Sequence, residues 1–335
     1  MKIKNTFTFI APDSIEIALK HFTEKENAVF LGGGTDYIPL AKYGVKNPQY
    51  VIGLDKIERL KKIEMRQEGL FIGAMSTLTE LMENEEIKKN FPILGEAAGC
   101  VASPQIRNVG TIGGNILQDR RCMYFNQTEY WRQSIEPCFK SGGKICHQAP
   151  PSPQCRAIYY SDLAPVLMAL DARAVCYDEM NFVQMPLKKV IHNHVVTNGG
   201  IAKPKFFITG FIIPYVQSDA WMKFVKHSIR ASIEFPIINS ALIYIPKDED
   251  SKHMKIKIVV GAVAPEPFEL VETEKYIQYH GFTGHEEEKI KKIARDEIRQ
   301  NSSLIRETGI SVKARKQGFG LIGHLLEQWF QFLCE

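Results

Sequence analysis

The sequence predicts an α+β protein with more than one lobe. Its 335 residues exceed what one hydrophobic core usually holds, and 44% of them are hydrophobic while 24% are charged, as in a globular protein that buries a core. In the first two thirds of the chain, short strand patterns alternate with helical patterns. From about residue 218 the patterns become longer strands and charged helices, so we place a domain boundary near 217.

The individual elements follow from apolar periodicity and from turn residues. Residues 11–22 ("APDSIEIALKHF") contain a turn, a candidate cap at Ser14 and apolar residues at helical spacing, so we expect a helix. In "NAVFLGGGTDYIPLAKYG" we expect a strand, then the three glycines, then a helical turn. Further strands are expected in "QYVIGLDKI", "LFIGAM" and "KFFITGFIIP", and helices in "TLTELMENEEIKKN" and "PILGEAAGCV". "DLAPVLMALDARAVCY" predicts a helix that runs into a strand.

The C-terminal third predicts long strands in "AWMKFVKHSIRASIEFPIINSALIYIP" and "KIKIVVGAV", with a helix between them. Two further helices are expected, in the charged segment "GHEEEKIKKIARDEIRQ" and in "SVKARKQGFGLIGHLLEQWFQFL".

Composition excludes several classes of protein. The net charge is only +4 and the basic residues are scattered, so nucleic-acid binding has no support. The longest apolar runs are too short for a membrane span, and Pro12 and Asp13 interrupt the apolar N-terminus, which argues against a signal peptide. Seven cysteines are an odd number. In a chain that we expect to be cytoplasmic, this favours metal binding or free thiols over a disulfide scaffold.

Two glycine-rich segments are candidate sites for a phosphate-bearing ligand. "LGGGTD" (31–36) follows a strand, and "QIRNVGTIGGN" (105–115) adds hydroxyl and amide side chains to a second set of glycines. Glycines let backbone N–H groups approach an anion closely, and two such loops could hold a pyrophosphate from two sides. The spacing is not that of a Rossmann fingerprint. A plain strand-to-helix turn and a tight hairpin remain alternatives.

Four cysteines gather in residues 122–155, together with two glycines and four prolines. Cys122, Cys138, Cys146 and Cys155 are separated by 15, 7 and 8 residues. Four thiolates suit a [4Fe–4S] cluster, but the spacing also leaves open a zinc site, with or without His147, and free thiols. The remaining cysteines, Cys100, Cys176 and Cys334, are expected to pack in the interior.

Five segments in order carry a resemblance to a known family. "LGGGTDYIPL", "IGAMSTLTEL", "SPQIRNVGTIGGNI", "SDLAPVLMALDARA" and "ITGFIIP" resemble the flavin-binding subunit of xanthine oxidase-family molybdenum hydroxylases. In that family "TIGGNI" and "SDLAPV" are usually a few residues apart, whereas here the cysteine stretch separates them. An insertion that begins with "RCMYFNQTEYWR" is similar to that of one branch, the beta subunit of 4-hydroxybenzoyl-CoA reductase, which carries an extra [4Fe–4S] cluster in this loop.

The resemblance implies an FAD-binding domain of the vanillyl-alcohol-oxidase/PCMH type at 1–217, followed by a smaller α+β domain at 218–335. The FAD-binding domain would have lobes at 1–57 and 58–217, and an iron–sulfur insertion at about 119–158. It implies that these residues contact FAD: Leu31, Gly32, Gly33, Gly34, Thr35, Asp36, Tyr37, Val101, Gly110, Thr111, Gly113, Gly114, Asn115, Asp162, Ile208 and Lys226. Cys122, Cys138, Cys146 and Cys155 would ligate the cluster.

Three of these residues have other interpretations. Asp162 could instead cap the helix that follows it, and Ile208 could be an ordinary core residue of a strand. Lys226 would share a helical face with Arg230 and Glu234 if that segment is a helix, and could then be solvated. By resemblance it lies near the flavin ring, where a cation would favour the anionic reduced form.

The resemblance also implies partners and a reaction. A molybdenum subunit and a [2Fe–2S] subunit would complete a hetero-oligomer, a dimer of heterotrimers. A ferredoxin would deliver electrons for the reductive removal of the phenolic hydroxyl of 4-hydroxybenzoyl-CoA. Two alternatives stay open: a subunit of another hydroxylase that passes electrons to NAD, and a zinc-stabilised scaffold. The segment 191–207 departs from the family pattern because it lacks an acidic residue before "ITGFIIP", and its His192 and His194 are more typical of a polar loop than of a metal site.

Overall fold

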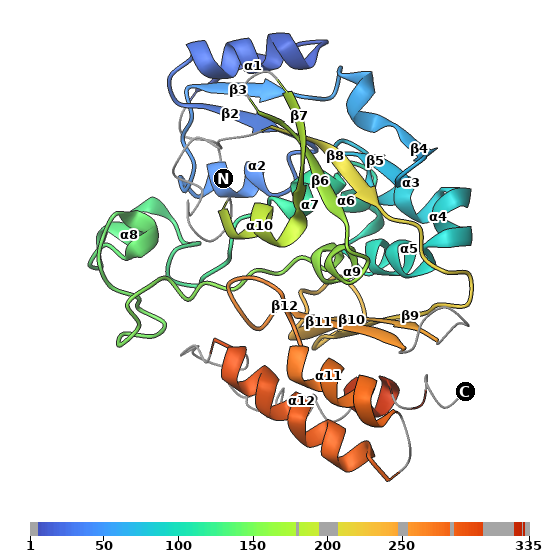
Figure 1. Ribbon diagram of the computed structural model, residues 1–335. Coiled ribbons are helices and arrows are strands. Elements are labelled where there is room, and N and C mark those ends of the chain that lie inside the picture. The colour runs from blue at the N-terminus through green and yellow to red at the C-terminus, as the bar shows by residue number, and fades with distance from the viewer. Residues whose placement is uncertain are drawn as a thin grey trace.

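The computed structural model describes residues 6–178, 181–193, 207–246, 254–281, 285–303, 325–329 and 331. Figure 1 shows three sheets stacked along the molecule, with the two helices α11 and α12 at the end farthest from the N-terminal sheet. The α+β class predicted from the sequence is confirmed. Among the described residues, no helix is both long and apolar enough to cross a membrane.

The N-terminal sheet is small and parallel. Its strands β1 (Thr8–Ile10), β2 (Ala28–Leu31) and β3 (Tyr50–Gly53) lie in the order β1-β3-β2. The helix α1 (Ile15–Glu24) buries Ile15, Ala18 and Phe22 against them, and its N-cap Ser14 accepts the Ile17 N–H, as predicted. The short helix α2 (Tyr37–Lys42) follows the first glycine loop.

The central sheet is antiparallel and has five strands in the order β4-β5-β8-β6-β7. Its strands are β4 (Ile63–Arg66), β5 (Gly69–Gly73), β6 (Arg173–Asp178), β7 (Asn181–Pro186) and β8 (Phe207–Ile213). All seven residues of β8 are buried. The strand is paired on both edges, and its side chains pack on both faces of the sheet: Phe211 lies in the main cluster, Phe207 packs with α1, and Ile212 packs with two neighbouring strands. The 3₁₀ turn η1 (Glu58–Lys61) leads into β4.

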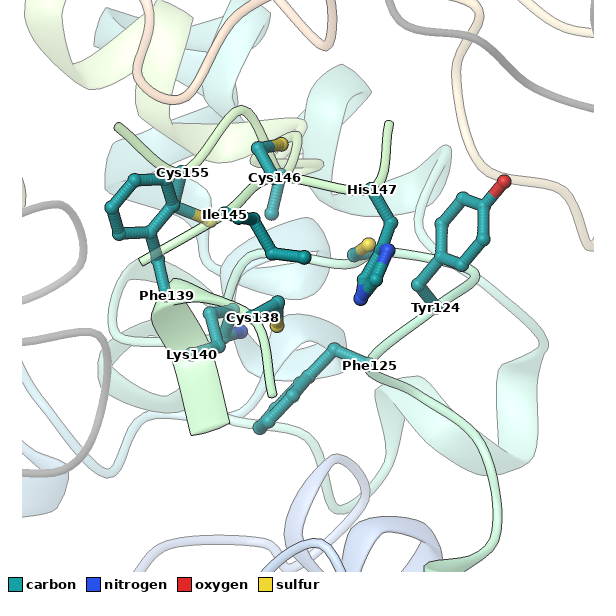
Figure 2. A pocket seen from close by; sticks show the side chains of 11 residues that line it. Tyr124, Phe125, Cys138, Phe139, Lys140, Ile145, Cys146, His147 and Cys155 are labelled. Carbon is teal, nitrogen blue, oxygen red and sulfur yellow. The ribbon is translucent and has the colours of Figure 1, made fainter. Parts of the chain in front are cut away.

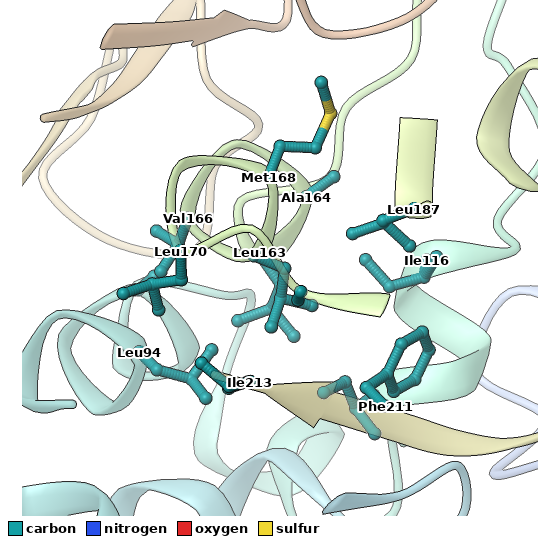
Figure 3. Close-up of a cluster of buried hydrophobic side chains, with 14 of the residues drawn as sticks. Leu94, Ile116, Leu163, Ala164, Val166, Met168, Leu170, Leu187, Phe211 and Ile213 are labelled. Atoms are coloured by element: carbon teal, nitrogen blue, oxygen red, sulfur yellow. The ribbon is translucent and has the colours of Figure 1, made fainter. Parts of the chain in front are cut away.

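Short helices pack against this sheet. The segment "TLTELMENEEIKKN" forms two helices rather than one, α3 (Leu78–Glu83) and α4 (Glu85–Asn90), because Asn84 ends the first and its side chain caps the second. The remaining helices are α5 (Pro92–Gly99), α6 (Pro104–Arg107), α7 (Ile112–Ile116), α9 (Leu163–Ala169) and α10 (Leu187–Ile191). All residues of α9 are buried, and Figure 3 shows this helix with Leu94, Ile116, Phe211 and Ile213 around it.

The C-terminal sheet is antiparallel, in the order β12-β11-β10-β9. Its strands are β9 (Trp221–His227), β10 (Ile238–Ile245), β11 (Lys255–Gly261) and β12 (Phe268–Glu269), followed by α11 (Val271–His280) and α12 (Glu287–Asn301). The prediction of a helix between the strands is wrong. β9 and β10 form seven residue pairs with each other, and the residues that connect them form bends. The last expected helix lies outside the described residues, apart from helical residues at 325–329 and 331.

One hydrophobic cluster joins the central and C-terminal sheets. It includes α9 together with Phe224, Ala241 and Val259 of the C-terminal sheet. The opposite face of that sheet packs with α11 and α12 in a second cluster. The C-terminal sheet is therefore covered on both faces, which fixes the two ends of the β9–β10 connection, whose residues Ile233, Glu234 and Phe235 line the cavity described next.

Candidate FAD cavity and cysteine pocket

The first glycine loop is shaped by its contact with the second. A Cβ atom on Gly33 would lie 1.6 Å from the carbonyl oxygen of Val109, and one on Gly32 would lie 2.9 Å from Oγ1 of Thr111. Gly34 has φ +74°, a conformation that favours glycine. These glycines are therefore required where two backbone segments touch, a reason that their spacing alone does not reveal.

The second glycine loop is held just as closely. A Cβ atom on Gly110 would lie 2.9 Å from the carbonyl oxygen of Ile106, and one on Gly113 would lie 2.7 Å from that of Ala74. Thr111 caps α7, because its Oγ1 accepts the N–H of Gly114 at 3.1 Å. The two loops thus present backbone N–H groups and a helix start at one place, as an anionic ligand requires.

A cavity of about 950 Å³ opens beside these loops. Its volume is in the upper range for cofactor pockets, and its walls come from β2, both glycine loops, the segment before α9, and β8. All of the residues predicted to contact FAD line this cavity except Lys226. The cradle of small residues, the backbone donors and the size together fit a long cofactor with a central diphosphate.

Asp162 belongs to a buried network at the cavity wall. It occupies the N-cap position of α9, but its side chain makes no capping hydrogen bond, so the capping interpretation is wrong. Ser161 caps instead, through the N–H of Ala164 at 2.9 Å. Asp162 accepts hydrogen bonds from Lys226 Nζ and Asn239 Nδ2, each at 2.7 Å. Burial raises the pKa of the Asp162 carboxyl, and these two donors oppose that rise.

Lys226 lies behind Asp162. It is on a strand, β9, so the helical face that it would have shared with Arg230 and Glu234 does not exist. Its side chain is 9% exposed, and its ammonium donates to Asp162 and to the carbonyl oxygen of Cys100, both at 2.7 Å. An effect of Lys226 on the flavin stays a prediction, and the contacts show that it would act through Asp162.

Sequence reasoning missed several residues of the cavity wall, of which Arg121, Tyr160 and Phe235 are the most informative. Arg121 donates from Nη2 to Oδ1 of Asp36 at 2.6 Å and lies over the ring of Phe235, 4.6 Å from its centroid. Phe235 in turn packs against Tyr160. The one signal in the sequence was Asp36. A carboxylate beside a loop proposed to bind phosphate would repel that anion, so it indicates that a cation lies nearby.

The four predicted cysteines line a single small pocket, together with Phe125, Phe139, His147 and other side chains. Figure 2 shows Cys138, Cys146 and Cys155 around it. Its volume is about 10 Å³, about enough for one water molecule. Burial raises the pKa of the Cys122 thiol to about 11, so an uncompensated thiolate is unfavourable there.

The insertion is tied to the FAD-binding domain at its two ends. Arg121 and Ile158 exchange backbone hydrogen bonds of 2.7 and 3.1 Å. Lys140, from the 3₁₀ turn η2 (Phe139–Ser141), is buried and donates to Oδ1 of Asp119 and to the carbonyl oxygen of Arg120, both at 2.7 Å. Between these ties the chain has only η2 and the short helix α8 (Glu129–Gln133).

No group of three or more His, Cys, Asp or Glu side chains in the described part of the chain is arranged to hold a metal ion. The iron–sulfur cluster and the zinc site therefore both stay predictions. The ring of His147 stacks on Tyr124, and its Nε2 lies 2.7 Å from the carbonyl oxygen of Glu136, where it can only donate. Nε2 is thus engaged and is not a free metal ligand.

The other cysteines and histidines have ordinary environments. Cys176 is buried in the main hydrophobic cluster and Cys100 is half-buried against it, so the packing interpretation is confirmed for both. His192 lies 3.1 Å from Glu266 through Nδ1. Cys334 and His194 are outside the described residues.

Comparisons with known proteins agree with this geometry. A family model described as the FAD binding domain in molybdopterin dehydrogenase matches residues 5–216. The alpha subunit of the 6-hydroxypseudooxynicotine dehydrogenase complex of Paenarthrobacter nicotinovorans is 25% identical over 256 residues, 76% of this chain and 72% of that one. The nicotinate dehydrogenase FAD-subunit of Eubacterium barkeri is 37% identical over 112 residues, 33% of this chain and 38% of that one.

Solved structures show the same fold along nearly the whole chain. A chain of the carbon monoxide dehydrogenase from Hydrogenophaga pseudoflava superposes with a TM-score of 0.74 at 18% identity, covering 98% of this chain and 96% of that one. A chain of quinoline 2-oxidoreductase from Pseudomonas putida 86 gives a TM-score of 0.72 at 15% identity and covers 99% of each. The family match over residues 5–216 shows that the chain belongs to the FAD-binding medium subunits of the xanthine oxidase-type molybdenum hydroxylases.

Proposed function

We propose that this chain is an electron-transfer subunit that holds FAD in the large cavity and a [4Fe–4S] cluster on Cys122, Cys138, Cys146 and Cys155. The single observation that carries the proposal is the adjacency of the two sites. Arg121 lines the FAD cavity and the next residue, Cys122, lines the cysteine pocket. One peptide bond thus connects the walls of the two pockets.

The donor set supports the cluster. Four thiols from separate parts of the insertion line one pocket, and a cubane takes one thiolate on each of its four irons. The pocket leaves space for about one water, so the thiols would move outward around a cluster. A flavin exchanges one or two electrons and an iron–sulfur cluster exchanges one, so a chain that holds both can link separate one-electron steps.

This chain supplies binding and charge at the FAD site. The residues of the two glycine loops and Asp162 would hold the cofactor, with Val101 and Ile208 among the apolar contacts. Asp162, fixed by Lys226 and Asn239, keeps a polar group at an otherwise apolar stretch of the wall.

At a finer level we propose the beta subunit of a 4-hydroxybenzoyl-CoA reductase, which acts in anaerobic aromatic degradation in the cytoplasm. The chain would accept electrons from ferredoxin and pass them to a [2Fe–2S] subunit and a molybdenum subunit, in a dimer of heterotrimers, to form benzoyl-CoA. The cysteine insertion supports this choice. The names of relatives such as nicotinate dehydrogenase and an aldehyde oxidoreductase favour a second candidate, an FAD subunit of another hydroxylase that reduces NAD.

The test starts with anaerobically purified protein. Iron and acid-labile sulfide are measured together with zinc, and reduced protein is examined by EPR. We expect four irons and four sulfides per chain and one FAD. Zinc in place of iron would contradict the cluster and support the scaffold alternative. The complex is then assayed with 4-hydroxybenzoyl-CoA and reduced ferredoxin, and in a second assay with NAD as electron acceptor. If the complex reduces NAD but does not turn over 4-hydroxybenzoyl-CoA with ferredoxin, the second candidate is selected.

A further inference from the structure

Two of the three carboxylates that line the FAD cavity are paired with cations that do not line it, Asp162 with Lys226 and Glu234 with Arg230, so the third, Asp36, decides the charge that an anionic ligand meets. The charged residues that line it are three carboxylates, Asp36, Asp162 and Glu234, and two cations, Lys46 and Arg121. FAD brings a diphosphate with two further negative charges. Backbone N–H groups offset part of this charge, but a neighbouring carboxylate such as Asp36 repels the ligand unless a cation neutralises it.

Arg121 is held in position to meet that need. Its Nη2 donates to Asp36, which directly follows the first glycine loop. Phe235 lies against the face of its guanidinium, and the backbone of Arg121 is fixed by two hydrogen bonds to Ile158. Three parts of the chain that are far apart in sequence therefore orient one side chain.

The guanidinium has donors to spare. Asp36 takes one of its five N–H groups; Nε is buried, so the donors left for a ligand are those of the two Nη atoms. The side chain keeps 30% of its surface exposed and lines the cavity. A planar guanidinium that is anchored on one edge can offer another edge to phosphate oxygens, which is the geometry that arginine favours.

We propose that Arg121 binds the diphosphate of FAD, with Asp36 and Phe235 positioning it. The first residues of the cysteine insertion would then be part of the flavin site as well as of the cysteine site, because Arg121 precedes Cys122. The proposal concerns FAD binding alone and stands whether or not the cysteines hold a cluster.

The experiment measures dissociation constants by flavin fluorescence on the 335-residue chain freed of its flavin, with FAD and with riboflavin, which has no phosphate. Arg121→Ala should weaken FAD binding about 10- to 100-fold, the loss expected for hydrogen bonds to a charged group. Riboflavin binding should change less than about twofold, because the apolar part of the cavity is intact. Added salt should weaken FAD binding less steeply in the variant than in the parent.

Two further variants decide between direct binding and simple neutralisation. If Arg121 only cancels the charge of Asp36, then Asp36→Asn combined with Arg121→Ala restores FAD affinity, and the proposal is overturned. If Arg121 contacts the diphosphate, the double variant stays weak. Arg121→Gln, a polar substitute, covers the case in which the alanine variant fails to fold.

Arg156→Ala is the matched control. Arg156 is next to Cys155 on the other arm of the insertion and does not line the cavity, so its replacement should leave FAD affinity unchanged. The proposal also fails if Arg121→Ala binds FAD within twofold of the parent, or if FAD and riboflavin weaken equally.

Discussion

The FAD cavity and the cysteine pocket share a border but are built in opposite ways. The cavity is about 950 Å³, and it is framed by two sheets and by glycine loops that touch backbone to backbone. The pocket is about 10 Å³ and is framed by turns, with one buried ion pair and one backbone bridge as anchors. The fold therefore shapes the first site through paired sheets and touching backbones, whereas only turns set the distances between the thiols of the second.

The largest expected effect is the loss of iron from a cysteine variant. Replacing Cys138 by Ser should remove or degrade the cluster almost completely, because a serine oxygen is a poor substitute for thiolate on iron. FAD content should remain, since the cavity is framed elsewhere. Iron and sulfide analysis with EPR checks this.

Cys100→Ser and Cys176→Ser are the controls, because both residues pack in the interior and neither lines the pocket. Ferredoxin-driven turnover should fail in Cys138→Ser while a small artificial donor still reduces the flavin. Full iron and an unchanged ferredoxin rate in Cys138→Ser would contradict the cluster.

Substitutions at two glycines, Gly33 beside the FAD cavity and Gly143 in the insertion, test the two sites separately. A Cβ on Gly33 would lie 1.6 Å from the carbonyl oxygen of Val109, and one on Gly143 would lie 1.6 Å from that of Pro137. Neither contact can be relieved without moving backbone, at a cost of about 1–3 kcal/mol or more. Gly33→Ala should reduce FAD occupancy and keep iron, while Gly143→Ala should reduce iron and keep FAD.

Cofactor content of both glycine variants, measured on soluble protein, checks this prediction. Loss of both cofactors in either variant would show that the two sites form one cooperative unit, and the contrast between them would then be wrong.

A smaller effect is expected at the buried ion pair of the insertion. Lys140→Met leaves the Asp119 side chain, which is 6% exposed, without its partner. Removing one partner of a buried ion pair typically lowers the free energy of unfolding by about 3–5 kcal/mol. We expect faster proteolysis within 122–155 and little change in FAD content. Adding Asp119→Asn should recover part of the loss, and equal protection of Lys140→Met and parent against protease would refute the anchoring role.

The smallest effect is expected at Lys226. Its replacement by Met removes the cation that stabilises the charged form of Asp162, so the pKa of that carboxyl, already raised by burial, rises further. Loss of positive charge behind the cavity wall should lower the midpoint potential of bound FAD. Spectroelectrochemistry measures it, with Lys275→Met as the control because the Lys275–Glu272 pair is at the surface and neither residue lines the cavity. An unchanged potential at full FAD occupancy would mean that Lys226 only supports Asp162.

Much of the FAD site could be predicted because its motifs are local. The glycines around 31–37 and 110–115 stand beside the strand and helix that they connect, and the cavity-lining residues predicted there all line the cavity. The domain limits at 57 and 217 stay predictions. One hydrophobic cluster joins α9 to Phe224 and Val259 across the limit at 217, so a change in the sequence pattern there does not correspond to a separate core.

What was missed is non-local. Arg121 meets Asp36 across 85 residues and Phe235 across a longer stretch still, and no periodicity in one segment can reveal such a contact. For Lys226 the sequence left a helical face with Arg230 and Glu234 open, and pairing of β9 with β10 makes the segment a strand.

The bridge between Arg121 and Ile158 has an evolutionary consequence. The chain leaves the FAD-binding domain and returns to it at the same point, so residues 122–157 form an excursion that ends where it began. A lineage could acquire or discard such a segment without altering the path of the surrounding chain, because the two flanking residues are already hydrogen-bonded neighbours. A redox centre can in this way be grafted onto an old flavoprotein as a separate module.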